Sequence, residues 1–206
     1  NTPQGFVEAR DAGIAYKTGK IGPVFGDFDG DGVPDLFVPQ LDGPCKLFKN
    51  DGKGKFRELE GAREWFKWKN LSADNVPAGV CIADINRDGL PDVVIGHHFK
   101  SPWSSPASIR VYLNKGNSDG VPTFADVTEA AGIGPLAMKA PHVEIQDFDN
   151  DGWPDLFIPH SKGGHHSLYH NNKDGTFTRI GSPAFTCPWA DWAGAGADLN
   201  QDGLLD

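Results

Sequence analysis

Four short acidic segments in this chain carry side chains that could bind a metal ion. Each follows the nine-residue pattern Asp-x-[Asp/Asn]-x-Asp-Gly-x-x-Asp, and the copies begin at Asp27, Asp84, Asp147 and Asp198. Calcium takes about six to eight oxygen ligands, and short acidic side chains at alternate positions of a tight loop supply them from one side. All-oxygen ligand sets favour calcium over zinc or copper. The pattern therefore predicts up to four Ca²⁺ sites.

The predicted ligands occupy positions one, three, five and nine of each loop, together with the backbone carbonyl of position seven. The glycine at position six fits a bend that a side chain would obstruct. The predicted set comprises Asp27, Asp29, Asp31, Val33 and Asp35 in the first loop, Asp84, Asn86, Asp88, Leu90 and Asp92 in the second, Asp147, Asp149, Asp151, Trp153 and Asp155 in the third, and Asp198, Asn200, Asp202, Leu204 and Asp206 in the fourth.

Two other interpretations of the pattern are weaker. An EF-hand loop has twelve residues, ends in a bidentate Glu and lies between helices. Here position twelve is Val38, Ile95 or Ile158, and the flanking residues are apolar and β-branched, as in strands. Ordinary Asp-Gly hairpin turns would explain one isolated copy. Four copies at regular intervals favour metal loops.

The loops belong to a longer repeat. They begin about 50 to 65 residues apart, in the range of propeller blades. An apolar strand follows each of the first three loops (36–38, 93–95 and 156–158), and a second strand then enters an Asn/Gly turn. Such a unit cannot bury both faces alone, and radial stacking of blades solves this. The sequence predicts an all-β chain, a β-propeller of four-stranded blades with calcium-binding hairpin loops.

The repeats also predict the boundaries of the blades. Residues 1–14 would end a preceding blade, because 5–14 resembles 123–133, and 15–71, 72–133 and 134–185 would each form a blade. Residues 186–206 would begin a further blade, and 61–70 could form one short helix. This makes about three and a half blades, whereas a ring closes with four to eight complete ones. We expect the chain to be a segment of a longer protein. A closed four-blade ring is the less favoured alternative.

Composition limits the partners and the compartment. No run of eighteen apolar residues could span a membrane, and no basic stripe is available for nucleic acid. The net charge is −9, which four Ca²⁺ ions would bring to −1. The demand for calcium favours the exterior, the cell surface or the periplasm, where calcium is millimolar. Three cysteines, Cys45, Cys81 and Cys187, cannot all pair with one another; buried thiols or one disulfide are the alternatives.

The loops, the preceding Phe25-Gly26 and the flanking strands resemble the FG-GAP (VCBS) repeat of integrin α-subunit propellers and secreted bacterial proteins. Residues 124–133, 142–158 and 168–177 are similar to repeats of the cartilage-acidic-protein group, which often carries an ASPIC/UnbV domain. The resemblance implies a propeller, usually of seven blades, with calcium on one face and ligand recognition commonly on the other. In the second and fourth loops Asn replaces the Asp found at position three of the other two loops. These loops have one fewer carboxylate, which predicts weaker calcium binding.

The leading hypothesis is a calcium-stabilised binding module outside the cytoplasm that recognises a carbohydrate or a protein, in contact with the rest of its own propeller. Recognition would fall to the connections opposite the calcium loops, which contain 97–106, 159–167 and 186–194. Trp and His can stack on sugars or anchor protein partners. The candidate contacts are Trp103, Trp189, Trp192, His97, His98, His165 and His166; the alternative for the tryptophans is packing of long connections.

Two further hypotheses remain open at this stage. The first is a propeller enzyme acting on sugars, such as a polysaccharide lyase or a dehydratase, with His97, His98, His160, His165 and His166 as general bases or ligands of a second metal. The second is a structural subunit of a surface assembly. No catalytic residue is predicted, since no paired Glu/His geometry can be derived from the sequence.

Overall fold

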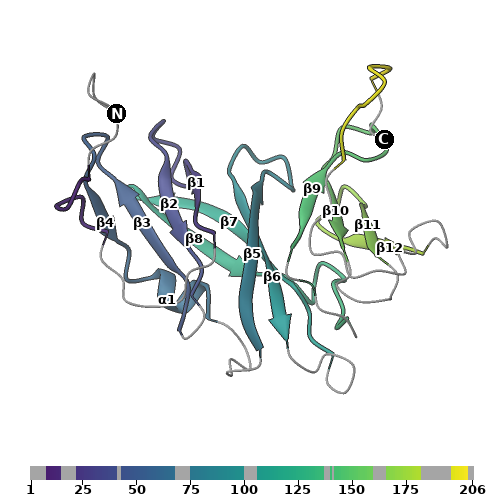
Figure 1. Cartoon of the computed structure of the whole chain (residues 1–206), viewed down its shortest axis with the longest axis horizontal. Helices are drawn as coiled ribbons and strands as arrows, with labels where there is room; N and C mark the ends of the chain where they lie inside the picture. Colours follow the sequence, from purple (N-terminus) through teal and green to yellow (C-terminus); the bar gives the residue numbers. More distant parts are fainter. Residues whose placement is uncertain are drawn as a thin grey trace.

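The computed structural model describes residues 8–14, 22–40, 43–67, 75–99, 106–136, 140, 142–159, 166–181 and 196–203. These residues form three antiparallel sheets of four strands, each contiguous in sequence and with strand order equal to chain order (Figure 1). The first sheet holds β1 (Val24–Gly26), β2 (Asp35–Val38), β3 (Lys46–Asn50) and β4 (Phe56–Glu58). The second holds β5 (Asn75–Ala83), β6 (Asp92–Phe99), β7 (Arg110–Ser118) and β8 (Val121–Asp126). The third holds β9 (Glu144–Gln146), β10 (Asp155–Ile158), β11 (Ser167–Asn171) and β12 (Phe177–Ile180).

The predicted all-β fold class is confirmed, and the four-stranded sheets are consistent with propeller blades. The described residues include one short helix, α1 (Ala62–Trp65), which lies between the first and second sheets in the chain, within the 61–70 segment expected to be helical. No described helix has the length and apolar character needed to cross a lipid bilayer.

Continuous apolar runs in the second strand of each sheet explain why the sheets stack. Successive side chains of a strand point to opposite faces, so a run without polar residues is buried on both sides. In β6, Val93 and Ile95 pack toward the first sheet and Val94 packs toward the third, and all three are fully buried. The middle sheet therefore lies between two apolar cores.

An aromatic cluster fills the core between the first and second sheets. Phe66, directly after α1, has its ring centroid 4.8 Å from Phe37 of β2, 5.0 Å from Tyr112 of β7 and 4.8 Å from Phe124 of β8. Edge-on and tilted contacts at these distances are favourable for aromatic rings. The short helix thus positions one phenylalanine so that it joins two sheets.

A different segment connects the second and third sheets. Residues 131–133, with the sequence Ala-Gly-Ile, lie against β12, where the Phe177 N–H donates to the Ala131 carbonyl at 2.8 Å. The same sequence at 12–14 lies against β4, where the Phe56 N–H donates to the Ala12 carbonyl at 2.7 Å. The two similar segments therefore make the same contact with the outer strand of the sheet that follows them.

Asparagines at the start of the outer hairpins also link neighbouring sheets. The Asn114 side-chain amide donates to the Phe28 carbonyl of the preceding loop at 2.8 Å, and the Asn171 amide donates to the Ile85 carbonyl at 2.9 Å. Both asparagines are buried. We call these two contacts the asparagine clasps. Each connects one acidic loop to the hairpin of the next sheet.

Two sequence expectations differ from the structure. The sequence places His97 and His98 in a connection, yet β6 continues to Phe99 because β5 pairs with it as far as Asn75. The repeat also predicts that the apolar second residue of each loop, which is Phe28, Ile85, Phe148 or Leu199, points into the packing between strands. Phe28 and Ile85 are buried, but Leu199 is 80% exposed; among the described residues no hairpin of a following sheet covers it.

The cysteine alternatives are partly resolved. Cys45 and Cys81 are free thiols, and burial raises the pKa of Cys45 to about 12 and that of Cys81 to about 11. Cys45 is fully buried in the core between the first two sheets. Cys187 lies outside the described residues. Thiols with such pKa values remain protonated and unreactive at neutral pH.

The asparagine clasps predict a measurable contribution to stability. Asn114→Ala leaves the buried Phe28 carbonyl without its donor, so the free energy of unfolding should fall by about 1–3 kcal/mol. Urea denaturation in calcium measures this change. The matched control is Asn172→Ala, because the exposed Asn172 side chain bonds only the hydroxyls of Thr176 and Thr178. Equal losses in the two variants would contradict a special role for the clasp.

Candidate metal centre

The four acidic loops share one hydrogen-bond pattern. In the first loop the Asp31 N–H donates to Asp27 Oδ1 at 3.0 Å and the Gly32 N–H donates to Asp27 Oδ2 at 2.8 Å. The side chain at position three accepts from the same N–H of position five, with Asp29 Oδ1 at 3.2 Å. The corresponding bonds recur in the other loops, at 2.8–3.2 Å. The side chains at positions one and three therefore turn toward the same concave side of each loop.

Left-handed backbone at two positions makes this bend possible. Position six is glycine in every loop, with φ of 84°, 89°, 87° and 90°. Position four also has positive φ, from 58° to 75°, although it is Gly30, Arg87, Asn150 or Gln201. Consecutive N–H groups consequently point inward, where the side-chain oxygens of positions one and three accept them. The sequence determines the loop conformation largely on its own.

The aspartate at position nine is buried in the three loops where it is described. Asp35, Asp92 and Asp155 each accept a 2.8 Å hydrogen bond from the backbone N–H of Asn50, Asn114 and Asn171, respectively. Asp92 also accepts from the Ile85 N–H at 3.0 Å. Burial raises the pKa of Asp92 to about 7, and it raises the pKa of Asp35 and of Asp155 as well. A nearby cation would reverse this shift by stabilising the carboxylates.

The donor set fits a hard divalent cation. Carboxylate oxygens of Asp27, Asp29 and Asp31 lie within 4.8 Å of one another, as do those of Asp147, Asp149 and Asp151. Asp35 Oδ2 is buried without a hydrogen-bond partner among the described residues, so an ion in the first loop would satisfy it. Hard oxygen donors in this arrangement suit Ca²⁺.

Cationic side chains lie beside the first and third loops, a feature that the sequence analysis missed. The Lys49 ammonium contacts Asp29 and lies 2.9 Å from Asp31 Oδ2. The Lys173 ammonium lies 3.0 Å from Asp151 Oδ2, and His170 lies beside Asp149 and Asp155. Lys49 and His170 both directly precede the hairpin asparagine. A basic or imidazole side chain directly before the hairpin asparagine is therefore the sequence signal that could have revealed these neighbours of the loops.

Arg87 contacts the neighbouring loop. Its guanidinium donates to the Gly152 carbonyl at 3.1 Å and lies 5.5 Å from the Trp153 ring centroid. The sequence predicts that Trp153 supplies a backbone carbonyl ligand. Its indole side chain makes a separate contact, with Arg87 of the neighbouring loop. The second and third loops are therefore adjacent, on the same edge of the stacked sheets (Figure 1).

Of the residues proposed for ligand recognition, only a few lie in the described structure. His97 is fully buried, which places its side chain away from the surface. His98 belongs to β6, and His166 is half-buried with its ring 5.5 Å from that of Phe157. Trp103, His160, His165, Trp189 and Trp192 lie outside the described residues, as do the predicted metal ligands Leu204 and Asp206.

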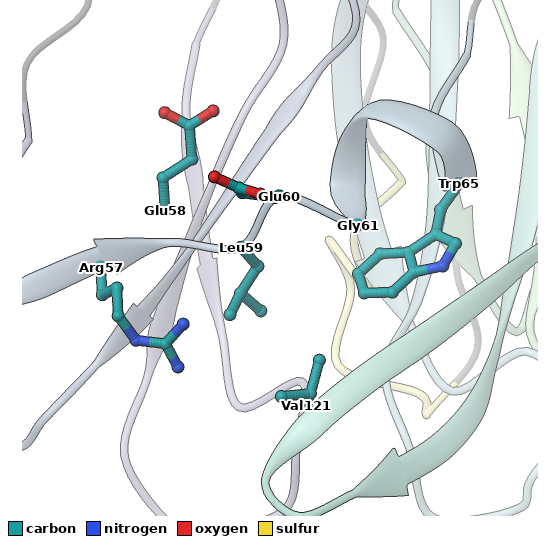
Figure 2. Close-up of a pocket in the computed structure, with 7 residues that line it drawn as sticks. All are labelled: Arg57, Glu58, Leu59, Glu60, Gly61, Trp65 and Val121. Atoms are coloured by element: carbon teal, nitrogen blue, oxygen red, sulfur yellow. The ribbon is translucent and has the colours of Figure 1, made fainter.

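A pocket that the sequence analysis did not predict lies at the outer rim, between the first and second sheets. Its volume is about 480 Å³ and it is lined by residues 57–61, Trp65 and Val121 (Figure 2). The Trp65 indole forms one side, and Arg57 extends from the other. The pocket combines an aromatic wall with charged groups. It involves none of the residues that the sequence predicts to bind a metal or a ligand.

Comparisons with known proteins agree with the repeat pattern. The FG-GAP-like repeat family matches residues 27–95 and 147–206, which is more than half of the chain. The chain belongs to this FG-GAP-like repeat family. The predicted family membership is confirmed. The first three acidic loops lie in the three described sheets, and the matched residues include these loops.

Curated relatives of this FG-GAP-repeat chain are much longer proteins. Cartilage acidic protein 1 of Xenopus tropicalis is 26% identical over 215 residues, covering 96% of this chain and 30% of that protein. Cartilage acidic protein 1 of Homo sapiens is 30% identical over 153 residues, covering 73% of this chain and 20% of that protein. Integrin alpha-6 of Gallus gallus is 27% identical over 141 residues, covering 66% of this chain and 12% of that protein. The chain therefore spans at most 30% of the length of these relatives.

Charge removal at position five tests whether the FG-GAP loops bind calcium. Asp31→Asn and Asp151→Asn keep an acceptor for the N–H of position seven but remove a carboxylate from the ligand set. We expect each variant to reduce the rise in melting temperature that calcium produces, because fewer anionic oxygens coordinate the ion. Asp174→Asn is the control, since the exposed Asp174 carboxylate accepts from the N–H and hydroxyl of Thr176 and is not one of the predicted metal ligands. A calcium-independent melt in the unmodified chain would mean that the loops are ordinary turns.

Burial of the position-nine aspartates predicts how stability depends on pH. Asp92 titrates at about 7 in the folded chain, compared with about 3.9 when unfolded. The folded state thus binds this proton more tightly, so without metal the free energy of unfolding should fall as pH rises from about 4 to 7. With a chelator, the melting temperature should be higher at pH 5.5 than at pH 8.

Calcium should reverse this loss, because it favours the ionised carboxylates. The calcium-induced rise in melting temperature should therefore be larger at pH 8 than at pH 5.5, which thermal melts with calcium and with chelator measure directly. A calcium effect of equal size at both pH values would contradict the assignment of Asp92 to the metal loop.

Proposed function

We propose that this chain is part of a calcium-stabilised propeller that recognises a carbohydrate or protein partner outside the cytoplasm. The observation that carries the proposal is the repeated loop: the same inward-facing acceptors at the same edge of successive sheets. Membership of the FG-GAP-like repeat family supports it. Relatives named integrin and cartilage acidic protein support an extracellular or cell-surface location.

In this proposal calcium has a structural role, with up to four sites. Three or four carboxylates in each loop repel one another when no cation is bound, so metal binding is coupled to the folded state. The position-nine aspartate contacts the hairpin of its own sheet, and the asparagine clasp connects that hairpin to the loop before it. An ion in one loop therefore stabilises the contact between two blades.

A neighbouring blade would cover Phe25 on the first sheet, which is 58% exposed. Leu36, Val38 and Phe48 form a buried apolar cluster in the same sheet, with Ile14 and Phe56 packed against it. Ala12 accepts from the outer strand β4 as Ala131, which follows the second sheet, accepts from β12. This likeness supports the proposal that residues 1–14 end a preceding blade, with 186–206 beginning a further one in a ring of seven blades.

Recognition is proposed for the side away from the calcium loops, where the connections after β2, β6 and β10 lie. His98 and His166 border these connections, and Trp103 and His165 belong to them in the sequence. Trp189 and Trp192 belong to the segment 186–194, which follows β12. The alternative of a sugar enzyme receives less support, because the His97 side chain is buried in the sheet. A scaffold role in a surface assembly would use the same side of the propeller.

A glycan array with the calcium-loaded chain, and a parallel sample in chelator, tests the proposal first. Calcium-dependent binding to one class of sugar is the expected result for a lectin-like role. A blank array, followed by capture of one stoichiometric protein from native extract, would establish the protein-partner alternative. Binding that is unchanged by chelator and by Asp31→Asn would contradict a calcium-stabilised recognition surface.

A further inference from the structure

One position beside the acidic loops differs from blade to blade. The residue directly before the hairpin asparagine is Lys49 in β3, Leu113 in β7 and His170 in β11. The three positions are equivalent, because the N–H of the following asparagine bonds the position-nine aspartate in every case. The backbone of the loops is thus the same, while the side chain next to the carboxylates offers an ammonium, a hydrocarbon or an imidazole.

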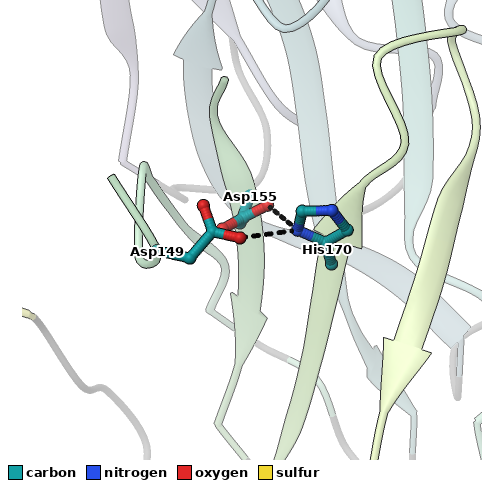
Figure 3. Close-up of side chains that lie close together, drawn as sticks. All are labelled: Asp149, Asp155 and His170. Carbon is teal, nitrogen blue, oxygen red and sulfur yellow. Dashed lines mark ion pairs between the residues drawn. The ribbon is translucent and has the colours of Figure 1, made fainter. Parts of the chain in front are cut away.

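The imidazole of the third blade lies within ligand distance of two carboxylates. His170 Nδ1 is 3.0 Å from Asp149 Oδ2 and 3.5 Å from Asp155 Oδ1 (Figure 3). One ligand atom from each of the three residues lies within 4.8 Å of the others. Asp155 is buried, and the His170 side chain is 30% exposed. The third loop therefore presents one nitrogen and two oxygens to a common point.

These separations suit a transition metal. Zinc and similar ions bind nitrogen and oxygen at about 2.0–2.2 Å, so neighbouring ligand atoms on one ion lie about 2.8–3.6 Å apart in octahedral or tetrahedral geometry. Imidazole nitrogen is a common ligand of Zn²⁺, Ni²⁺ and Cu²⁺, whereas Ca²⁺ takes oxygen. Both distances from His170 Nδ1 fall within that interval.

The charges around the third loop favour the same subset of ligands. The Lys173 ammonium lies 3.0 Å from Asp151 Oδ2 and lowers the pKa of that carboxyl. Asp151 is thus already paired with a cation and lies farther from the imidazole, with its Oδ2 4.0 Å from His170 Nε2, whereas Asp149 and Asp155 lie 3.0 and 3.5 Å from His170 Nδ1. In the first loop the equivalent residue is the Lys49 ammonium, which has no lone pair to donate while it is charged. In the second loop it is Leu113, which has no donor atom.

We propose that the third loop prefers a first-row transition metal such as Mn²⁺ or Zn²⁺, bound by His170 Nδ1, Asp149 and Asp155, while the first and second loops keep all-oxygen ligand sets suited to calcium. The proposal rests on the metal-binding role of the loops and adds a division of metal preference among them. His170 acts as a direct ligand, and Lys173 as the residue that neutralises Asp151.

Electron spin echo spectroscopy with Mn²⁺ tests the proposal directly. The full chain receives one equivalent of Mn²⁺ in millimolar calcium, which fills the all-oxygen loops. We expect ¹⁴N modulation from a coordinated imidazole, and we expect His170→Leu to abolish it. His142→Leu is the matched control, since His142 lies beside Glu144 outside the loop and its loss should leave the modulation intact.

A transplanted ligand provides the complementary test. Lys49→His in the His170→Leu background places an imidazole beside the carboxylates of the first loop and should restore the ¹⁴N modulation. Calorimetric titration with Zn²⁺ should show at least about a tenfold loss of affinity in His170→Leu, because removal of even outer-shell partners costs that much. Affinity for Ca²⁺ at the other loops should not change.

The outcomes separate this proposal from the proposed function. Mn²⁺ bound without ¹⁴N modulation would overturn the role of His170 and leave the metal-stabilised propeller intact. Modulation that survives His170→Leu would assign the nitrogen to another histidine and also overturn the proposal. Absence of both Mn²⁺ and Ca²⁺ binding would contradict the proposed function itself.

Discussion

The aspartate at the end of each of the first three acidic loops is the residue on which the arrangement of the sheets depends. It is the last residue of its loop and the first of the second strand, and it is buried. Its carboxylate accepts the N–H of the hairpin asparagine, and in the second and third sheets that asparagine in turn donates to the preceding loop. In those two sheets one acidic side chain therefore connects an acidic loop, its own sheet and, through the asparagine clasp, the neighbouring sheet.

Burial of this carboxylate has an energetic cost that the rest of the structure has to offset. Removing a carboxylate from water without a counter-ion is unfavourable, so its pKa rises, as it does for Asp92. Backbone N–H donors offset part of the cost, and a divalent cation would offset more. Blade stacking is thus linked to this constraint, and the same constraint would make the stability of the fold depend on a bound cation.

The contacts between sheets follow a common plan with local differences. Alternating apolar residues bury both faces of the middle sheet, so each pair of sheets shares a core. The first pair is joined by Phe66 after a short helix, and the second pair by residues 131–133. The short helix that precedes Phe66 also supplies Trp65, which lines the rim pocket.

The sequence by itself determined the loops and the sheets. Position-specific Asp and Gly residues define the loop conformation through bonds spanning no more than five residues, and apolar runs followed by Asn/Gly turns define the strands. Such short-range patterns can be recognised without knowledge of the fold.

Only the tertiary structure brought together residues that are distant in the chain. Lys49 lies 20 residues beyond Asp29, and the Asn114 amide reaches a carbonyl 86 residues away. The burial of His97, the lysines beside the first and third loops and the imidazole beside Asp149 depend on how strands pair and sheets stack. No local pattern encodes these contacts, because they form between elements whose separation in the sequence differs from blade to blade.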